Sequence, residues 1–221
     1  VLVNALKIAC ELLEMEAGII SQIQGGQYEI QYIHTTELES LKAGTILPAE
    51  DTFCDLVYKE ESLITIADAS ADETFSQHQC YVRLNIESFI GEPLRLSNAV
   101  YGTLSFVSTK PRSIGFNQAD ESFIRLMAQW VASVLERDSV ERNLRQSEER
   151  FRVMFEMAPI GIYLMTLDGV IRRANSAFTT MLGYEENGLT NTDIELLLHP
   201  DESIGALLEG TTQEQGMYHN E

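Results

Sequence analysis

The pattern of apolar and polar residues predicts five strands interleaved with helices in the first half of the chain. Near the N-terminus, heptad-spaced apolar residues predict an amphipathic helix over 2–15; they are Val3, Leu6, Cys10 and Leu13. Period-two alternation then predicts strands; they span 18–24, 28–33, 62–68, 87–96 and 99–108. A short helix is expected around 52–60, and an irregular segment with one helical turn over 69–85. This order of elements indicates an α+β fold.

A long helix is expected to follow, from Gln118 to Glu156. Asn117 is a natural N-cap, with Asp120 three residues later. The helix carries two neighbouring apolar stripes; they are Phe123, Met127, Trp130 and Val134, and Ile124, Val131 and Leu135. We expect one stripe to cover the sheet and the other to meet a partner helix.

These helices predict a parallel homodimer through residues 2–15 and 118–150. An amphipathic helix needs a partner to bury its apolar face. The side chains expected to form the dimer and relay helix are Leu6, Leu13, Ile124, Val131, Leu135 and Leu144. Apolar residues thin out after Leu135, so residues 137–147 are interpreted as a helical signalling linker.

A second, smaller unit is predicted after the linker. Strands over 161–166 and 170–175 meet at Asp168-Gly169, a strong hairpin signal. Asn175 is expected to cap the next helix and Gly183 to end it. The pattern predicts a partial α/β unit over 148–221.

Composition and charge exclude several classes of function. The net charge is −19, and an acidic surface repels phosphate backbones, so nucleic-acid binding is not expected. No apolar run approaches the length of a membrane span, and no signal peptide is visible. Three irregularly spaced cysteines predict neither disulfides nor a metal centre, and they suit the cytoplasm. The chain starts at Val1, so we expect a fragment of a longer protein.

Residues 1–136 resemble a GAF domain. The resemblance rests on HQCYVRLNIESFIGEPL (78–94), VYGTLSF (100–106) and PRSIGFNQADESFIRLMAQWVASVLER (111–137). It implies a central antiparallel sheet with a terminal helix pair on one face and a ligand pocket on the other. Such domains are common in bacterial, especially cyanobacterial, multi-sensor kinases and cyclases.

Residues 148–221 resemble the N-terminal part of a PAS domain. The segments that carry the resemblance are SEERFRVMFEMAPIGIYLMTLDGVIRRANSAFTTMLGY (147–184) and LLLHPDES (196–203). The remaining strands of such a domain would follow Glu221, so we expect a truncated domain. His199 belongs to the HPDE turn of this resemblance and is interpreted as a turn residue.

Strand alternation and the GAF resemblance together predict the walls of a ligand pocket. The expected residues are Phe53, Cys54, Tyr81, Phe89, Gly91 and Phe106. No cofactor is expected. Ser76 and Gln77 stand where bilin-attaching relatives carry a Cys-His pair. The cyclic-nucleotide motif NKFDE is matched only in its second half, by Phe116, Asp120 and Glu121.

The sequence therefore predicts the sensory input region of a bacterial signal-transduction protein. Its output domain, a histidine kinase or a cyclic-di-GMP enzyme, would follow in the same chain, and no catalytic residue is expected in this part. The alternative is a thiol-based redox sensor, or a GAF-fold redox enzyme, that uses Cys54 or Cys80. The residues alone leave the ligand open.

Overall fold

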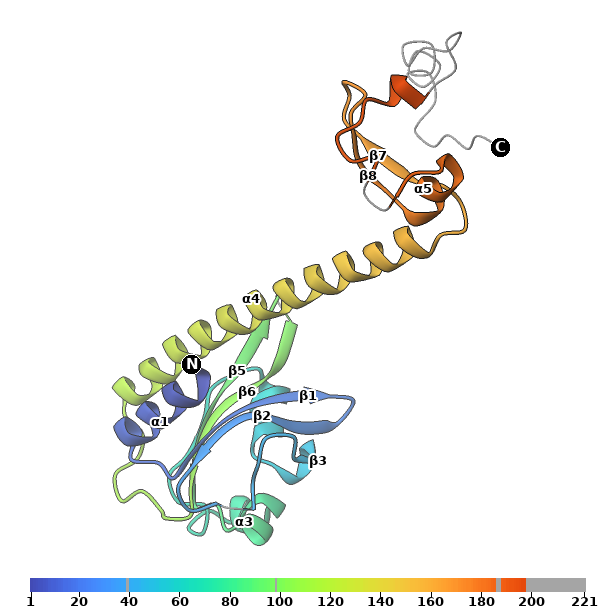
Figure 1. Cartoon of the computed structure of the whole chain (residues 1–221). Helices are drawn as coiled ribbons and strands as arrows, with labels where there is room; N and C mark the ends of the chain where they lie inside the picture. The colour runs from blue at the N-terminus through green and yellow to red at the C-terminus, as the bar shows by residue number, and fades with distance from the viewer. Residues whose placement is uncertain (39, 98, 186–187, 198–221) are drawn as a thin grey trace. The chain divides into compact units, whose positions relative to one another are not determined.

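A computed structural model describes residues 1–38, 40–97, 99–185 and 188–197 (Figure 1). The chain divides into two compact units, Val1–Glu141 and Arg142–Glu221. One helix, α4 (Gln118–Met157), contributes residues to both units.

The first unit is built on a six-stranded antiparallel sheet, which confirms the predicted α+β fold. Its strands are β1 (Ala17–Gln24), β2 (Gln27–Thr35), β3 (Ile46–Pro48), β4 (Ile64–Ile66), β5 (Ser88–Leu96) and β6 (Ala99–Ser108). Their order across the sheet is β3-β2-β1-β6-β5-β4, so β1 and β6 lie at the centre. The turn between β1 and β2 has positive φ at Gly25 and Gly26, as that dipeptide predicts.

The edge strand β3 was not predicted from the sequence. It has three residues and ends at Pro48, so its pattern is too short to reveal period-two alternation. It pairs with β2, where Tyr28 lies opposite Leu47.

Helices cover both faces of the sheet (Figure 1). One face, called the helix face, is covered by α1 (Leu2–Leu13) and the first half of α4. These helices pack on Ile20, Leu104 and Phe106. The opposite face carries α2 (Cys54–Glu60) and α3 (Gln79–Leu84). Two 3-10 turns, Ala49–Asp51 and Phe75–Gln77, precede these short helices.

The structure corrects the predicted roles of the helix stripes. Five of the six side chains expected at a dimer interface are buried in the core of the first unit, and only Leu144 is exposed; the buried ones are Leu6, Leu13, Ile124, Val131 and Leu135. The sheet takes the stripe that was expected to meet a partner. Trp130 and Val3 are instead 40% and 44% exposed, although Met127, from the same stripe as Trp130, is buried in this core.

The start of α4 is capped as its sequence predicts. The Asn117 Oδ1 atom accepts hydrogen bonds from the backbone N–H groups of Ala119 and Asp120, at 2.7 and 3.1 Å. The Asp120 carboxylate in turn accepts a hydrogen bond from the Asn117 backbone N–H at 3.0 Å. This reciprocal pair satisfies N–H groups that lack a partner within the helix.

The second unit contains a two-stranded hairpin, β7 (Tyr163–Met165) and β8 (Ile171–Ala174), followed by helix α5 (Ser176–Leu182). A 3-10 turn, Ile194–Leu197, completes the described part. Ile171, Leu189 and Ile194 form its small core. Asn175 caps α5 and Gly183 ends it with a φ of 76°, both as predicted. His199 lies outside the described residues.

Two kinds of feature are absent from the described residues. None of their helices combines the length and the apolar character that crossing a membrane requires. They also contain no cluster of His, Cys, Asp and Glu side chains that could hold a metal ion.

Candidate functional site

The face of the sheet opposite α1 and α4 carries an unusual row of hydroxyl groups at its centre. Ser21, Thr103 and Ser105 are fully buried on β1 and β6, where apolar residues would ordinarily pack. Ser21 lies directly opposite Thr103, and their hydroxyl oxygens are 2.8 Å apart. Burying a hydroxyl group costs free energy unless the group is hydrogen-bonded. The bond between Ser21 and Thr103 therefore offsets part of the cost of removing both hydroxyls from water.

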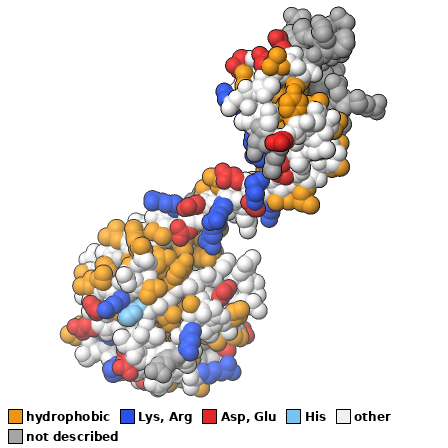
Figure 2. All heavy atoms as spheres, in the orientation of Figure 1, with side chains coloured by type: hydrophobic (Ala, Val, Ile, Leu, Met, Phe, Trp, Pro, Cys, Tyr) orange, Lys and Arg blue, Asp and Glu red, His pale blue; other side chains and the backbone are white. Residues whose placement is uncertain are grey.

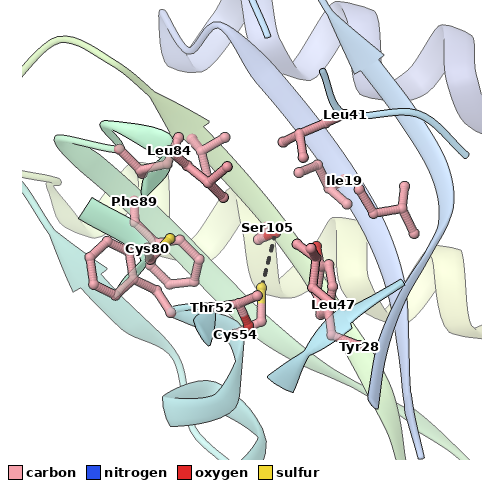
Figure 3. A pocket seen from close by; sticks show the side chains of 14 residues that line it. Ile19, Tyr28, Leu41, Leu47, Thr52, Cys54, Cys80, Leu84, Phe89 and Ser105 are labelled. Atoms are coloured by element: carbon pink, nitrogen blue, oxygen red, sulfur yellow. Dashed lines mark hydrogen bonds between the residues drawn. The ribbon is translucent and has the colours of Figure 1, made fainter. Parts of the chain in front are cut away.

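A thiol and a phenol join this polar row. The Cys54 thiol, at the start of α2, donates a hydrogen bond to the Ser105 Oγ atom over 3.5 Å (Figure 3). The Tyr28 hydroxyl, from β2, interacts with Ser21 and Cys54. Burial raises the pKa of Tyr28 well above its ordinary value and also raises the pKa of Cys54. Both groups therefore stay neutral at physiological pH.

Apolar side chains enclose a cavity above this polar row (Figure 3). The cavity, including its mouth to solvent, measures about 380 Å³. It is lined by Ile19, Tyr28, Ile30, Leu41, Leu47, Thr52, Phe53, Cys54, Cys80, Leu84, Ile86, Phe89, Ser105 and Val107. Elements from distant parts of the chain meet at this cavity. Strands β1, β2 and β3 supply one wall, and α2, α3 and β5 supply the other.

The structure places three of the six predicted pocket residues in this lining: Phe53, Cys54 and Phe89. Gly91 is not in the lining but lies opposite Ser105 in the neighbouring strand. A Cβ atom at Gly91 would lie 2.5 Å from the Phe89 ring, so any larger residue here would displace that ring from the cavity wall. Tyr81 packs at the edge of the same core, and its neighbour Cys80 lines the cavity instead.

Phe106 requires a correction, because it belongs to the other face of the sheet. It is fully buried in the core beneath α1 and α4. Successive residues of a strand point to opposite faces, so Ser105 and Val107 face the cavity while Leu104 and Phe106 face the helices. The assignment of Phe106 to the pocket was therefore wrong by one residue.

The histidine of the HQCY segment has a structural role. The His78 Nδ1 atom accepts a hydrogen bond from the Cys80 backbone N–H at 3.1 Å and so caps α3. Its ring lies 4.8 Å from the Phe53 ring, centroid to centroid, and burial lowers its pKa. A neutral imidazole suits this acceptor role. The cap thereby fixes the helix that carries Cys80 into the cavity wall.

The residues that match half of the cyclic-nucleotide motif also have structural partners. Asp120 belongs to the cap of α4 and lies 3.7 Å from the Arg112 guanidinium. That guanidinium stacks over the Phe116 ring, 4.6 Å from its centroid. Neither Asp120 nor Phe116 lines the cavity.

The cysteines are expected to be unreactive in the native protein. All three are buried free thiols, and burial raises the pKa of Cys80, like that of Cys10, to about 12. Since the thiolate is the reactive form, alkylation by iodoacetamide at pH 7.5 should be roughly 100-fold slower than in the urea-denatured chain. Mass spectrometry over a time course measures both rates. Fast modification of native Cys54 or Cys80 would contradict this expectation and favour the thiol-based alternative.

An antiparallel sheet covered by helices on both faces, with a cavity under the shorter helices, defines a small α+β domain with an internal cavity. Comparison with known families then identifies it: the GAF domain family matches residues 1–135, and the chain belongs to this family. The PAS domain family matches residues 149–215, which follow the GAF domain. No curated protein sequence matches the chain.

Solved structures share the fold of the first unit. The GAF domain of a phosphoenolpyruvate-protein phosphotransferase from Coxiella burnetii has a TM-score of 0.52 at 21% identity, and the match covers 64% of this chain and 86% of that one. The phycocyanobilin-bound GAF domain of a cyanobacterial phytochrome gives 0.51 at 13%, with 63% and 84% covered. The GAF domain of a two-component sensor histidine kinase from Bacillus halodurans gives 0.50 at 16%, with 63% and 94% covered. At these identities the likeness shows the fold alone.

Proposed function

We propose that this chain is a sensory input region in which the GAF cavity binds a small molecule and α4 passes the resulting change to the PAS domain. GAF and PAS domains are sensory domains of signalling proteins, and this chain carries both. The observation that carries the proposal is the continuity of α4, which begins in the first unit and ends in the second.

The sheet links the cavity to the first half of α4. Strand β6 presents Ser105 to the cavity and Leu104 to the helix face. Leu104 is packed in one cluster with Ile124 and Val131 of α4. Because protein interiors are close-packed, a ligand that displaces Ser105 must also displace the side chains on the other face of the same strand.

The last turn of α4 is held by the second unit through four contacts. The Asn175 Nδ2 atom donates to the Phe155 carbonyl at 3.0 Å, and the Ser176 hydroxyl donates to the Glu156 carbonyl at 3.1 Å. Arg173 lies 3.3 Å from the Glu156 carboxylate and 4.8 Å from the centroid of the Phe155 ring. Helix C-termini leave carbonyl groups without partners, and here side chains of the PAS domain satisfy two of them.

We further propose that α4 forms a parallel homodimer through its exposed seam. Exposed residues along α4 alternate at three- and four-residue steps; they are Leu126, Trp130, Ser133, Arg137, Val140, Leu144, Ser147, Phe151 and Met154. This spacing averages 3.5 residues, which is the period of a left-handed coiled coil. Figure 2 shows apolar side chains gathered over α1 and the first half of α4. Ser133, Arg137 and Ser147 interrupt the seam, so the coil would be weak and able to change register.

The output domain is proposed because GAF and PAS domains commonly occur in the same chain as an output domain. A histidine kinase or a cyclic-di-GMP enzyme after this chain would use the signal, and one structural neighbour comes from a two-component sensor histidine kinase. The free thiols favour a reducing compartment such as the cytoplasm. The thiol-based alternative has less support, because burial keeps Cys54 and Cys80 protonated.

Insertions after Asp138 test the relay. Each inserted residue rotates the second unit by about 100° about the helix axis, whereas seven residues restore the phase of a coiled coil. In a protein that carries an output domain after this chain, one to three inserted residues should change output strongly, and seven should largely restore it. The measurement is autokinase or cyclase activity. A smooth decline with insertion length, without dependence on phase, would indicate a flexible tether and overturn the relay.

A further inference from the structure

The chemistry of the cavity points to a class of ligand. Resting on the proposed ligand role of this cavity, we propose that its ligand is a small neutral molecule with an apolar body and one hydrogen-bond-accepting oxygen. The proposal stands on three observations: the absence of charge in the described lining, the donor that remains on Ser105, and the size of the enclosed space.

The lining contains no charged side chain among the described residues. Its polar members are all neutral: Tyr28, Thr52, Ser105 and the two thiols. A charged ligand would lose its hydration here without gaining a counter-charge, which is far more costly than burying a neutral molecule. Asp55, which follows the lining residue Cys54, is not in the lining and is paired with Lys59 at 2.6 Å. The cavity therefore selects against carboxylates, phosphates and ammonium groups.

Ser105 supplies the recognition of an acceptor oxygen. Its Oγ atom accepts the Cys54 thiol proton, and a hydroxyl that accepts one bond still has its own proton to donate. Ser105 lies at the centre of the cavity floor in Figure 3, whereas the paired hydroxyls of Ser21 and Thr103 lie outside the lining. The Thr52 hydroxyl donates to the Ala49 carbonyl at 2.8 Å, so its proton is already used. A ketone, ether or hydroxyl oxygen above Ser105 would complete the network.

The enclosed space sets the size of the ligand. The 380 Å³ include open solvent at the mouth, and only a small part of that volume is enclosed among the lining residues, so a single ring is the largest body that the walls could admit. The walls include the rings of Phe53 and Phe89, which lie 5.6 Å apart at an edge-to-face angle of 63°. Such walls favour a single aromatic or alicyclic ring. A tetrapyrrole or a nucleotide is both too large and too highly charged for this space.

Three probes of similar size separate the elements of the proposal: acetophenone, ethylbenzene and benzoate. They share a benzene ring and differ in the acceptor oxygen and in charge. Isothermal titration calorimetry on the 221-residue chain should show acetophenone binding about fivefold more tightly than ethylbenzene, which is the usual net value of one hydrogen bond. Benzoate should give no measurable binding at millimolar concentration.

Three substitutions test whether the probes bind in the cavity, above Ser105. Ser105→Ala removes the donor, so acetophenone and ethylbenzene should then bind equally. Ser113→Ala, at an exposed loop position, is the matched control and should leave the fivefold preference unchanged. Cys80→Met adds volume from α3 without altering the sheet, and it should weaken both neutral probes at least tenfold. Circular dichroism melts of each variant establish that the chain remains folded.

Each outcome decides between the proposals. Benzoate binding as tightly as acetophenone, or a preference that survives in Ser105→Ala, would overturn the ligand class and leave the sensory role standing. Failure of all three probes to bind the folded wild-type chain would overturn both the ligand class and the ligand role of the cavity. The relay through α4 is judged separately by the insertions after Asp138, which do not depend on any probe.

Discussion

Val131→Glu is expected to unfold the GAF domain rather than only to separate a dimer. Val131, a residue of α4, is fully buried in the same cluster as Leu6 of α1 and Leu104 of β6. A carboxylate placed there loses its hydration without a partner, and such changes belong to the small group that costs about 4 kcal/mol or more. Urea unfolding followed by circular dichroism should show this loss in the free energy of unfolding.

Two variants on the same helix make the comparison specific. Gln129→Glu adds the same charge at an exposed position, so it should change the stability by less than about 0.5 kcal/mol. Leu144→Glu lies on the proposed seam, with its side chain 58% exposed. It should leave the GAF domain folded and shift the chain toward monomer in sedimentation equilibrium. A stable, folded Val131→Glu protein that is merely monomeric would contradict the buried position of this residue.

Asn175→Ala is expected to loosen the second unit and its hold on α4. The Asn175 side chain makes four hydrogen bonds while fully buried. Its Oδ1 atom accepts from the N–H groups of Ile162 and Phe178, each at 2.9 Å. Its Nδ2 atom donates to the carbonyls of Phe155 and Ile160, at 3.0 and 2.9 Å. Alanine leaves these four backbone groups without partners, at a cost of roughly 3 kcal/mol.

Hydrogen exchange on the whole chain localises this effect. Amides of 155–182 should lose protection in Asn175→Ala, while amides of the GAF sheet should keep theirs. Asn175→Asp keeps the two accepted bonds but replaces both donors with acceptors, so we expect it to release the end of α4 and still cap α5. Asn143→Ala, at an exposed position on α4, serves as the control. Unchanged protection of Phe155 and its neighbours in both Asn175 variants would show that this side chain does not hold the helix.

Local sequence signals determined where most elements begin and end. The hairpin at Gly25-Gly26, the cap at Asn117, the cap at Asn175 and the stop at Gly183 all appear in the structure as their residues predict. Each depends on interactions within a few residues of the chain, such as a side-chain oxygen that meets a nearby N–H group. The order of strands and helices, and with it the α+β class, could therefore be predicted before any tertiary contact was known.

The assignment of faces depended on tertiary structure. In β6 both faces are buried, so its alternation of residues does not reveal which face meets the helices and which meets the cavity. Phe106 was placed on the wrong face for this reason, and the polar row of Thr103 and Ser105 was overlooked. The signal was present, since both small polar residues occur at alternate positions of a buried strand. Interpreting this signal as a buried polar row requires the contacts with Ser21 and Cys54, which come from distant parts of the chain.

The stripes of α4 show the same division. The sequence determined that the helix has more apolar surface than one interface needs, because the stripes of Trp130 and Val131 lie side by side. Which stripe enters the core depends on how α1 and the sheet meet the helix, and that contact joins residues more than 100 positions apart. Periodicity within one helix thus determines that a face is apolar, whereas only the packing of all the elements decides what covers it.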